Sequence, residues 1–348
     1  MESVPNTFAP ETCHQHLLDG LVPALAYTPK RDYAEWRQAV ELRLHELLGP
    51  MPAVVPLNIR MEEESEQEFY REKRFVFTSE LGADVPCHLL LPQGRKEPMP
   101  LVLCLQGHTS GMHISMGRPK NENDEKMISS GDRDFALQAV REGHAALVME
   151  QRCFGERRDA RAGSVRHLEN GCHHASMVAL LLGRTMVGER VWDVRRAIDA
   201  LAHFPEIDLQ RIGCMGNSGG GTISWFAACV EPRIRIAMPS CYVCSLKHSI
   251  AQIDHCADNY VPGLLRWFDL GDLACLIAPR PLIVVAGETD PIFPIAGVYQ
   301  AFATIQQIYT RAGAPDRCRL VVGEGGHRFY AAQSWPLFKE FLSQEEMP

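Results

Sequence analysis

One serine of the chain stands in a segment that could expose it as a nucleophile. Ser218 lies in the glycine-rich segment 216–221, directly after an apolar run and before a helical pattern that begins near Thr222. A tight strand-to-helix turn strains the backbone and presses it against the next helix, so its neighbours must lack side chains, as Gly216 and Gly220 do. A phosphate-binding loop is the alternative, but Gly-x-Gly-x-x-Gly spacing and a P-loop lysine are both missing. The segment therefore predicts a serine nucleophile.

A serine hydroxyl is a weak nucleophile, so a base must accept its proton and a third group must orient that base. Asp290 closely follows the apolar run 282–286, and His327 follows the next apolar run, in a segment with three glycines. We therefore expect a catalytic triad in which His327 is the base and Asp290 the acid. Such a triad would form a covalent acyl-enzyme on Ser218.

Other carboxylates compete for the role of the acid. Asp290 could instead cap a helix before Pro291, and Glu288 would then be its substitute. Asp254 and Asp258, in the long segment after the apolar run 234–238, are weaker candidates.

A tetrahedral intermediate also needs two fixed donors for its negatively charged oxygen. The backbone N–H of Gly219, at the positive end of the helix that follows Ser218, is the first expected donor. The backbone N–H of His108 is the second, because the segment 106–111 directly follows the apolar run 101–105.

Two further pairs of residues have spacings that are typical of metal or redox sites. His173 and His174 are adjacent and cannot both face one metal ion from a helix, so we interpret them as helix-start residues. Cys241 and Cys244 have redox spacing, but no helix start follows them, which favours a structural role. We expect no metal site, because no set of cysteines and histidines has zinc spacing, and the proposed chemistry needs no cofactor.

The elements that would position these residues are short apolar runs alternating with helical patterns, the signature of parallel strands buried on both faces. Two further runs, 75–77 and 87–91, indicate an antiparallel hairpin, and the acidic run 62–68 indicates a solvated edge or linker. With that hairpin the sequence predicts an eight-stranded, mostly parallel sheet. The parallel strands are expected at 101–105, 145–149, 212–215, 234–238, 282–286 and 320–322. Helices are expected on both faces of the sheet, near 31–49, 133–142, 173–203, 219–230, 294–312 and 333–344.

Three connections are too long for ordinary loops, and each follows the carboxyl end of a predicted strand, where ligands bind in open parallel sheets. These insertions, 107–131, 151–172 and 239–272, are the expected walls of a substrate pocket. We divide the chain into an N-terminal helical extension at 1–60 and a catalytic domain at 61–348. The candidates for pocket walls are Met112, Tyr242, Trp267, Phe268 and Phe293.

Composition limits the classes of partner and the cellular compartment that we expect for the protein. The net charge of −8 disfavours nucleic acid and anionic lipid, since both require Lys and Arg to replace counterions. Residues 1–5 open a polar segment without the features of a secretory signal, and no apolar run approaches membrane-spanning length. The twelve cysteines are scattered through apolar runs, as reduced thiols are. We expect a cytoplasmic protein that acts on a small ester.

From residue 100 to 345 the sequence resembles the α/β-hydrolase superfamily, in which the triad residues follow the chain order Ser, Asp, His. More narrowly, it is similar to the acetyl xylan esterase and dienelactone-hydrolase-like branch. The motifs that carry this likeness are 106–111, 183–185 with 191–199, 216–220 and 278–281 leading to 290–291. The resemblance implies an α/β-hydrolase fold, a catalytic Ser218 with Asp290 and His327, and hydrolysis of short-chain, often acetyl, esters. The sequence differs from many relatives in two features: Gln106 replaces a common histidine, and the segment 239–272 is long. Dienelactone hydrolases proper use a cysteine nucleophile, where this sequence has Ser218.

Two alternatives to an esterase stay open. A serine peptidase or amidase could use the same triad, and a non-catalytic ligand-binding homologue could keep the fold without turnover. The N-terminal extension, with its amphipathic helix, could cover its own domain or a neighbouring subunit, so a homo-oligomer is possible.

Overall fold

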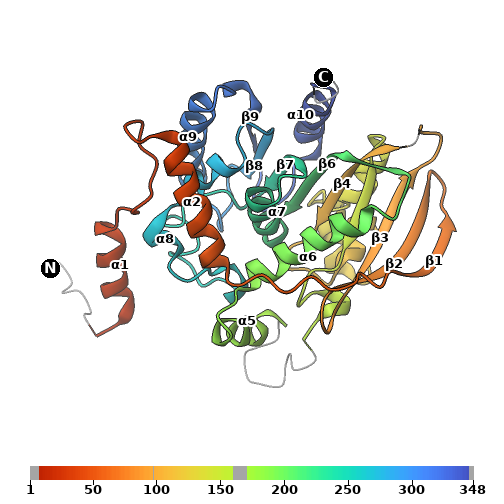
Figure 1. Ribbon diagram of the computed structural model, residues 1–348, viewed down its shortest axis with the longest axis horizontal. Coiled ribbons are helices and arrows are strands. Elements are labelled where there is room, and N and C mark those ends of the chain that lie inside the picture. Colours follow the sequence, from red (N-terminus) through yellow and green to blue (C-terminus); the bar gives the residue numbers. More distant parts are fainter. Residues whose placement is uncertain (1–7, 97, 160–170, 345–348) are drawn as a thin grey trace.

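The computed structural model, which describes residues 8–96, 98–159 and 171–344, contains one sheet in the strand order β1-β2-β3-β5-β4-β6-β7-β8-β9 (Figure 1). The prediction of eight strands was therefore one short. The extra strand is β1, an exposed edge strand formed by most of the acidic run, whose charged side chains show no inward-facing apolar alternation. The strands are β1 (Arg60–Glu66), β2 (Tyr70–Glu80), β3 (Ala83–Pro92), β4 (Met99–Leu105), β5 (Ala145–Met149), β6 (Ile207–Asn217), β7 (Ile234–Ser240), β8 (Leu282–Gly287) and β9 (Cys318–Gly323).

The direction of the strands changes along the sheet. β1, β2 and β3 run antiparallel to their neighbours, and β3 pairs antiparallel with β5, whereas the pairs from β5 to β9 are parallel. β4 and β6 are neighbours, and the chain leaves β4 toward β5 but leaves β6 toward β7, so the connections after these two strands run in opposite directions. Ligands of open α/β sheets bind at the carboxyl edge where the strand order reverses, which here is the edge of β4 and β6.

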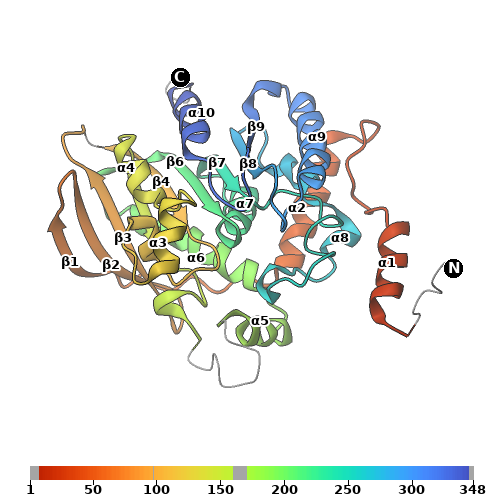
Figure 2. The same cartoon turned by 180° about the vertical axis from the view of Figure 1, so that it is seen from behind.

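Helices cover both faces of the sheet, as the apolar strands require, and Figures 1 and 2 show the two faces in turn. One core contains side chains of α2 (Tyr33–Leu48), α6 (Met186–Leu201), α7 (Gly219–Val230) and α9 (Ile295–Arg311). The core on the other face contains side chains of α4 (Phe135–Arg141) and α10 (Ala331–Gln344). This arrangement is the expected α/β-hydrolase fold.

The single helix predicted over 173–203 is two helices, α5 (Cys172–Leu181) and α6. Gly183 has a φ of 71°, which ends the first helix, and Thr185 caps the second by accepting a hydrogen bond from the backbone N–H of Gly188. The sequence analysis also missed α1 (Pro10–Gly20), α3 (Glu122–Ser129) and the single-turn helix α8 (Leu264–Trp267).

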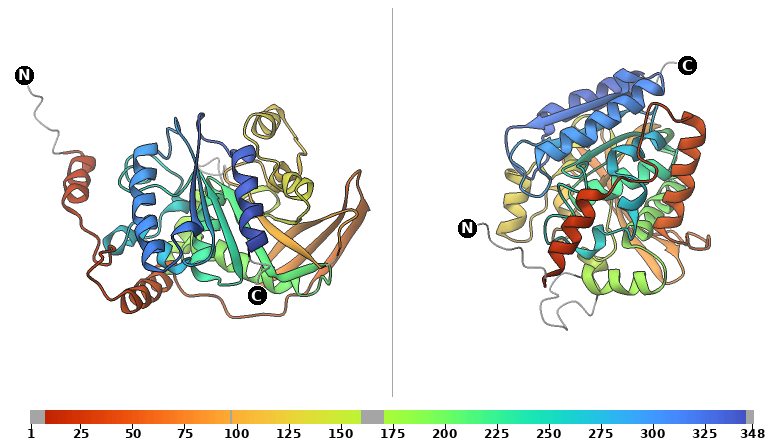
Figure 3. Two further views of the ribbon diagram at one scale, coloured as in Figure 1. Left: turned by 90° about the horizontal axis from the view of Figure 1, so that it is seen from above. Right: turned by 90° about the vertical axis from the view of Figure 1, so that its left-hand side faces the viewer.

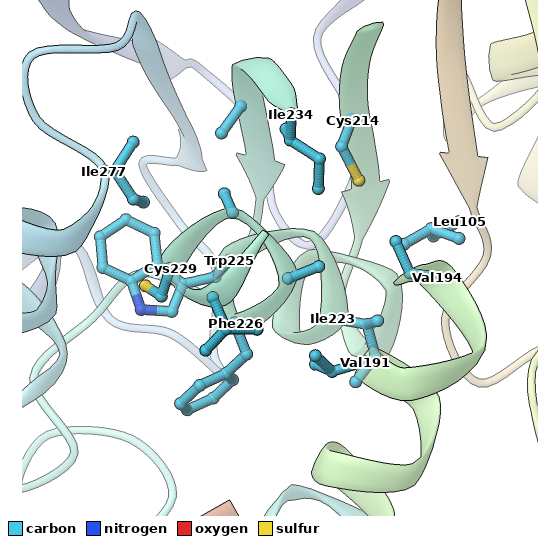
Figure 4. Close-up of a cluster of buried hydrophobic side chains, with 14 of the residues drawn as sticks. Leu105, Val191, Val194, Cys214, Ile223, Trp225, Phe226, Cys229, Ile234 and Ile277 are labelled. Atoms are coloured by element: carbon cyan, nitrogen blue, oxygen red, sulfur yellow. The ribbon is translucent and has the colours of Figure 1, made fainter. Parts of the chain in front are cut away.

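The helix that follows Ser218 is fully enclosed by the rest of the protein. All twelve residues of α7 are buried. Figure 4 shows its apolar side chains, among them Ile223, Trp225 and Phe226, packed among residues of α6 and of the central strands. Because α7 is apolar on every side, other elements must pack around it in all directions. This packing fixes the position of the turn at Ser218.

The N-terminal residues differ in how they pack. The predicted helix near 31–49 is α2, which begins after its cap Asp32 and buries Trp36, Val40, Leu44 and Leu48 in the main core. In contrast, α1 buries no residue and lies at the opposite end of the molecule from β1 (Figure 3). The domain division at residue 60 stays a prediction. Within the described ranges, no helix has both the length and the apolarity to cross a bilayer.

Candidate active site

Ser218 occupies a strained turn between β6 and α7. Its φ of 59° and ψ of −122° lie outside the regions that serine favours. The turn is held by a hydrogen bond of 2.9 Å from the backbone N–H of Ser218 to the carbonyl oxygen of Ser240. A Cβ atom at Gly220 would lie 1.9 Å from the carbonyl oxygen of Leu105, and one at Gly216 would lie 2.4 Å from that of Gly220. Only glycine fits at both positions.

His327 and Asp290 form a hydrogen-bonded pair. The distance from His327 Nδ1 to Asp290 Oδ2 is 2.8 Å, and Asp290 Oδ1 accepts the backbone N–H groups of Ile292 and Phe293 at 2.9 and 3.2 Å. Burial raises the pKa of Asp290, but the hydrogen bond from His327 and the two backbone N–H groups outweigh it, so the pKa lies below its ordinary value. Asp290 is therefore an ionised carboxylate that can keep Nδ1 protonated.

The competing carboxylates form no bond with His327 in the described structure. Glu288 is exposed, and Asp258 is buried in ion pairs with Arg190 and His108. Asp254 is exposed on the wall of the cavity that contains Ser218. Of the four candidates for the acid, Asp290 is the one bonded to His327.

Ser218 and His327 line one cavity of about 360 Å³ at the carboxyl edge of the sheet. This volume is at the small end for ligand pockets, which suits a small substrate. Its other walls come from α3, from Arg133 and from the segment between β7 and β8. The lining residues besides Ser218 and His327 are His108, Met127, Arg133, Ile253, Asp254, His255, Cys256 and Ile292.

The segments that carry the two predicted oxyanion donors lie against each other. The segment after β4 packs against the start of α7, and a Cβ atom at Gly107 would lie 3.0 Å from the backbone nitrogen of Gly219. The ring of His108 lies against Gly219, with Nδ1 3.2 Å from where a Cβ would be. Among the described groups, neither the N–H of Gly219 nor that of His108 has a hydrogen-bond acceptor. An oxyanion hole would require such unengaged N–H groups.

Arg133 is a functional candidate that the sequence analysis missed. It is 8% exposed, and its Nη2 donates to the carbonyl oxygen of His327 at 3.2 Å. Arg133 Nη2 also donates a hydrogen bond of 3.2 Å to the side-chain oxygen of Asn217. That oxygen accepts a second bond of 3.2 Å from the backbone N–H of Ser218, and the amide nitrogen of Asn217 donates to Ser240. In the described part of the chain no carboxylate forms an ion pair with Arg133. A buried cation without an ion-pair contact in the described ranges therefore lies beside the nucleophile.

Sequence reasoning could not place Arg133 at the site, because it is an arginine in an undistinguished segment before α4. Burial lowers the pKa of the Arg133 guanidinium, and the nearby Cys241 and Asp290 only partly offset this effect. A buried, positively charged guanidinium at this point would favour negative charge that develops in the cavity.

The five predicted pocket residues do not line the cavity of Ser218 in the described structure. Phe293 is the nearest to the triad: its ring stacks on that of His327, with centroids 5.8 Å apart and an interplanar angle of 22°. Tyr242 packs on Phe293 and lines a separate apolar cavity of about 230 Å³, which Leu18 of α1 also lines. The others are a buried Met112, a fully buried Phe268, and Trp267 beneath the guanidinium of Arg43.

The remaining predicted residues have structural surroundings. His173 and His174 lie in the first turn of α5, as expected of helix-start residues. Burial raises the pKa of the Cys241 and Cys244 thiols to about 12 in each case, and Cys241 Sγ lies 3.2 Å from the carbonyl oxygen of Arg328. These two cysteines are packed, protonated thiols. Residues 160–170 of the predicted insertion 151–172, and residues 1–7, lie outside the described structure.

A second group of chemically capable side chains borders the cavity. One donor atom from each of His108, Cys172, Cys256 and Asp258 lies within 4.8 Å of the other three. These atoms could hold a metal ion.

The sequence is similar to those of known hydrolases. A sequence model of the Abhydrolase family matches residues 8–321. The chain is 28% identical over 297 residues to "Putative hydrolase YtaP" of Bacillus subtilis, covering 82% of this chain and 92% of that protein.

Solved structures share the fold at low sequence identity. A structure described as a "putative acetyl xylan esterase" from Bacteroides fragilis has a TM-score of 0.75 at 17% identity and covers 93% of this chain and 84% of its own. A glucuronoyl esterase from Solibacter usitatus has a TM-score of 0.69 at 16% identity, with coverage of 93% and 97%.

Proposed function

The chain belongs to the Abhydrolase family, and from that premise we propose that it is a serine carboxylesterase that hydrolyses short-chain esters, acetyl esters above all. One observation carries the proposal. Ser218 stands on a strained turn in a cavity that it shares with His327, and the ring of His327 is bonded to Asp290.

The geometry supports an acyl-enzyme mechanism. His327 Nε2 takes the proton of Ser218 Oγ, which attacks the acyl carbon, while Asp290 supports the imidazolium that forms. The N–H groups of Gly219 and His108 bind the oxyanion. His327 then protonates the departing alcohol, and a water molecule, deprotonated by the same histidine, releases the acid and restores Ser218.

The preference for short acyl groups follows from the cavity. Its volume is about 360 Å³, and its walls combine apolar Met127, Ile253 and Ile292 with polar side chains. A long acyl chain would need a larger apolar channel than these walls form. The likeness to a structure described as an acetyl xylan esterase also supports an acetyl group.

The location of the protein is proposed on different grounds. All twelve cysteines lie in the described ranges as free thiols, and ten of them are buried. We propose a reducing, cytoplasmic compartment on this basis.

The test is hydrolysis of p-nitrophenyl acetate, butyrate and octanoate by the wild type and by Ser218→Ala, with Ser343→Ala, an exposed serine of α10, as the matched control. We expect acetate to be turned over fastest, Ser218→Ala to be inactive, and Ser343→Ala to match the wild type. Intact mass should show an adduct of a fluorophosphonate probe on the wild type and on Ser343→Ala alone.

Each other outcome has a defined meaning. Undiminished turnover by Ser218→Ala would remove Ser218 from the mechanism. A labelled serine without ester turnover would favour a peptidase or amidase, and neither labelling nor turnover would favour a non-catalytic binding protein.

A further inference from the structure

Four potential metal ligands converge from three separate segments beside the cavity of Ser218. His108 follows β4, Cys172 is the first residue of α5, and Cys256 and Asp258 lie in the segment between β7 and β8. One nitrogen, two sulfurs and one carboxylate oxygen are thus all within 4.8 Å of one another. Cys172 and Asp258 are each 1% exposed, whereas His108 and Cys256 are partly exposed, so the group extends from the protein interior to the cavity wall.

Two of the four ligand candidates, His108 and Asp258, are in close contact. Nε2 of His108 lies 3.0 Å from Asp258 Oδ2, and this buried nitrogen has no further partner among the described atoms. In a tetrahedral zinc site, neighbouring nitrogen and oxygen ligands are about 3.3 Å apart and two sulfurs about 3.8 Å apart. The observed separation is therefore near that of two ligands of one ion.

We propose that His108, Cys172, Cys256 and Asp258 bind one zinc ion. Two sulfur donors exclude magnesium and calcium, which take oxygen ligands, and a mixed sulfur, nitrogen and oxygen set in a tetrahedron suits zinc.

The charges around the group balance when zinc is present. Two thiolates, one carboxylate and one Zn²⁺ leave a net charge of about −1, by the ordinary charges of these ligands. The buried guanidinium of Arg190 supplies the opposite charge: its Nη1 lies 2.7 Å from Asp258 Oδ2 and its Nη2 lies 3.6 Å from Cys172 Sγ. Arg190 would thus stabilise both a carboxylate and a thiolate ligand.

A second layer of contacts orients the carboxylate. Asp258 Oδ1 accepts a hydrogen bond of 2.9 Å from the side chain of Asn259, whose own oxygen accepts one of 2.7 Å from Thr222 in α7. Outer contacts of this kind commonly fix the ligands of structural metal sites. They also link the proposed site to the helix that follows Ser218.

Four protein ligands leave no open coordination position, so the zinc would be structural. It would join α5 and the segment between β7 and β8 to the segment after β4, which carries the expected oxyanion donor. His108 and Cys256 line the cavity of Ser218, so the ion would hold two of its walls. The proposal does not depend on esterase activity, and metal content tests it directly.

The experiment measures zinc per chain by inductively coupled plasma mass spectrometry, in protein purified without a metal-affinity tag. We expect about one zinc per chain in the wild type and its loss in Cys256→Ser and Asp258→Asn. Cys275→Ser, which changes a buried cysteine outside this group, should keep the zinc. Wild-type protein without zinc, or zinc retained by both ligand variants, would overturn the proposal.

A second measurement uses the wild type, so that it tests the site even if the ligand variants fail to fold. Wild-type protein exchanged into Co²⁺ should show the visible bands of a tetrahedral site and a near-ultraviolet thiolate-to-cobalt band, and a chelator should remove them and lower Tm. Octahedral cobalt spectra would contradict the site. A mass lower by two hydrogens in the metal-free protein as isolated, from a disulfide between Cys172 and Cys256, would contradict it as well.

Discussion

The side chain of Arg133 donates a hydrogen bond to the backbone carbonyl oxygen of His327, so a buried cation is attached directly to the segment that carries the proposed base. This contact joins the segment before α4 to the loop after β9. It places positive charge beside Ser218 without a compensating carboxylate in ion-pair contact among the described residues.

Replacing Arg133 by methionine should therefore lower kcat more than it raises KM. One donor to a developing oxyanion contributes about 10² to 10³ in rate, and we expect a loss of about 10² because Arg133 supplies charge from beside the two N–H donors. Steady-state kinetics on p-nitrophenyl acetate would measure it. Arg141→Met, at an exposed arginine of α4, is the control, and an unchanged kcat in Arg133→Met would refute the role.

Asp290→Asn should leave the fold intact and lower kcat by about 10⁴, since an amide at this position favours the wrong tautomer of the histidine. The decrease is measured as kcat at saturating ester, with circular dichroism to verify folding. Glu288→Gln, at the exposed alternative acid two residues away, should retain the wild-type rate. The reverse pattern would assign the acid to Glu288.

Gly220→Ala should destabilise the protein severely, because its methyl group would lie 1.9 Å from a backbone oxygen of β4 that cannot move alone. We expect a loss of several kcal/mol, about the range of overpacked core substitutions or above it. Urea denaturation gives the value. Gly20→Ala, where no atom lies within 4 Å of the added methyl group, is the matched control, and equal midpoints for the two variants would contradict the steric argument.

Ionisation of the buried Glu150 carboxyl should lower the stability of the protein as the pH rises towards neutrality. Burial raises the pKa of this carboxyl to about 7, although the backbone N–H groups of Met112 and Glu156 partly oppose the shift. The folded state then binds more protons than the unfolded state between about pH 4.5 and 7. The stabilisation is thus fully present below the unfolded pKa and is lost as the pH rises through the folded one.

Glu150→Gln carries no titrating proton and should flatten this part of the stability profile. The size of the effect is on the order of 3 kcal/mol, by the usual conversion of a pKa shift. Urea midpoints between pH 4.5 and 8 would show it, with the exposed Glu63→Gln as the control. A parallel decline in Glu150→Gln and the wild type would assign the pH dependence to other groups.

The sequence predicted those parts of the site that depend on local signals. Each residue of the proposed triad follows a strand, and Ser218 and His327 lie among glycines. Strand ends and turn residues were therefore sufficient to predict that Ser218, Asp290 and His327 lie at one edge of the sheet. The parallel strand order is needed only to make these strand ends adjacent at the edge of the sheet.

The rest of the site depends on packing between distant segments. Arg133 reaches His327 across 194 positions, and Cys172 and Cys256 are 84 positions apart, a distance at which no zinc spacing is visible in sequence. Tyr242 and Phe268 were expected as pocket walls, but large apolar side chains are usually buried, and here they are part of the core. The acidic strand β1 was missed because an exposed edge has no buried face to impose alternation.

The complete burial of α7 limits how this protein can evolve. Every residue of that helix is enclosed, so almost any substitution there must be accommodated by several neighbours at once. New substrate preferences should therefore arise at cavity-lining residues to which no role in the chemistry or in the proposed zinc site is assigned, such as Met127, Ile253 and Ile292. A directed-evolution library restricted to those residues would retain a higher fraction of folded variants than one that includes residues 219–230.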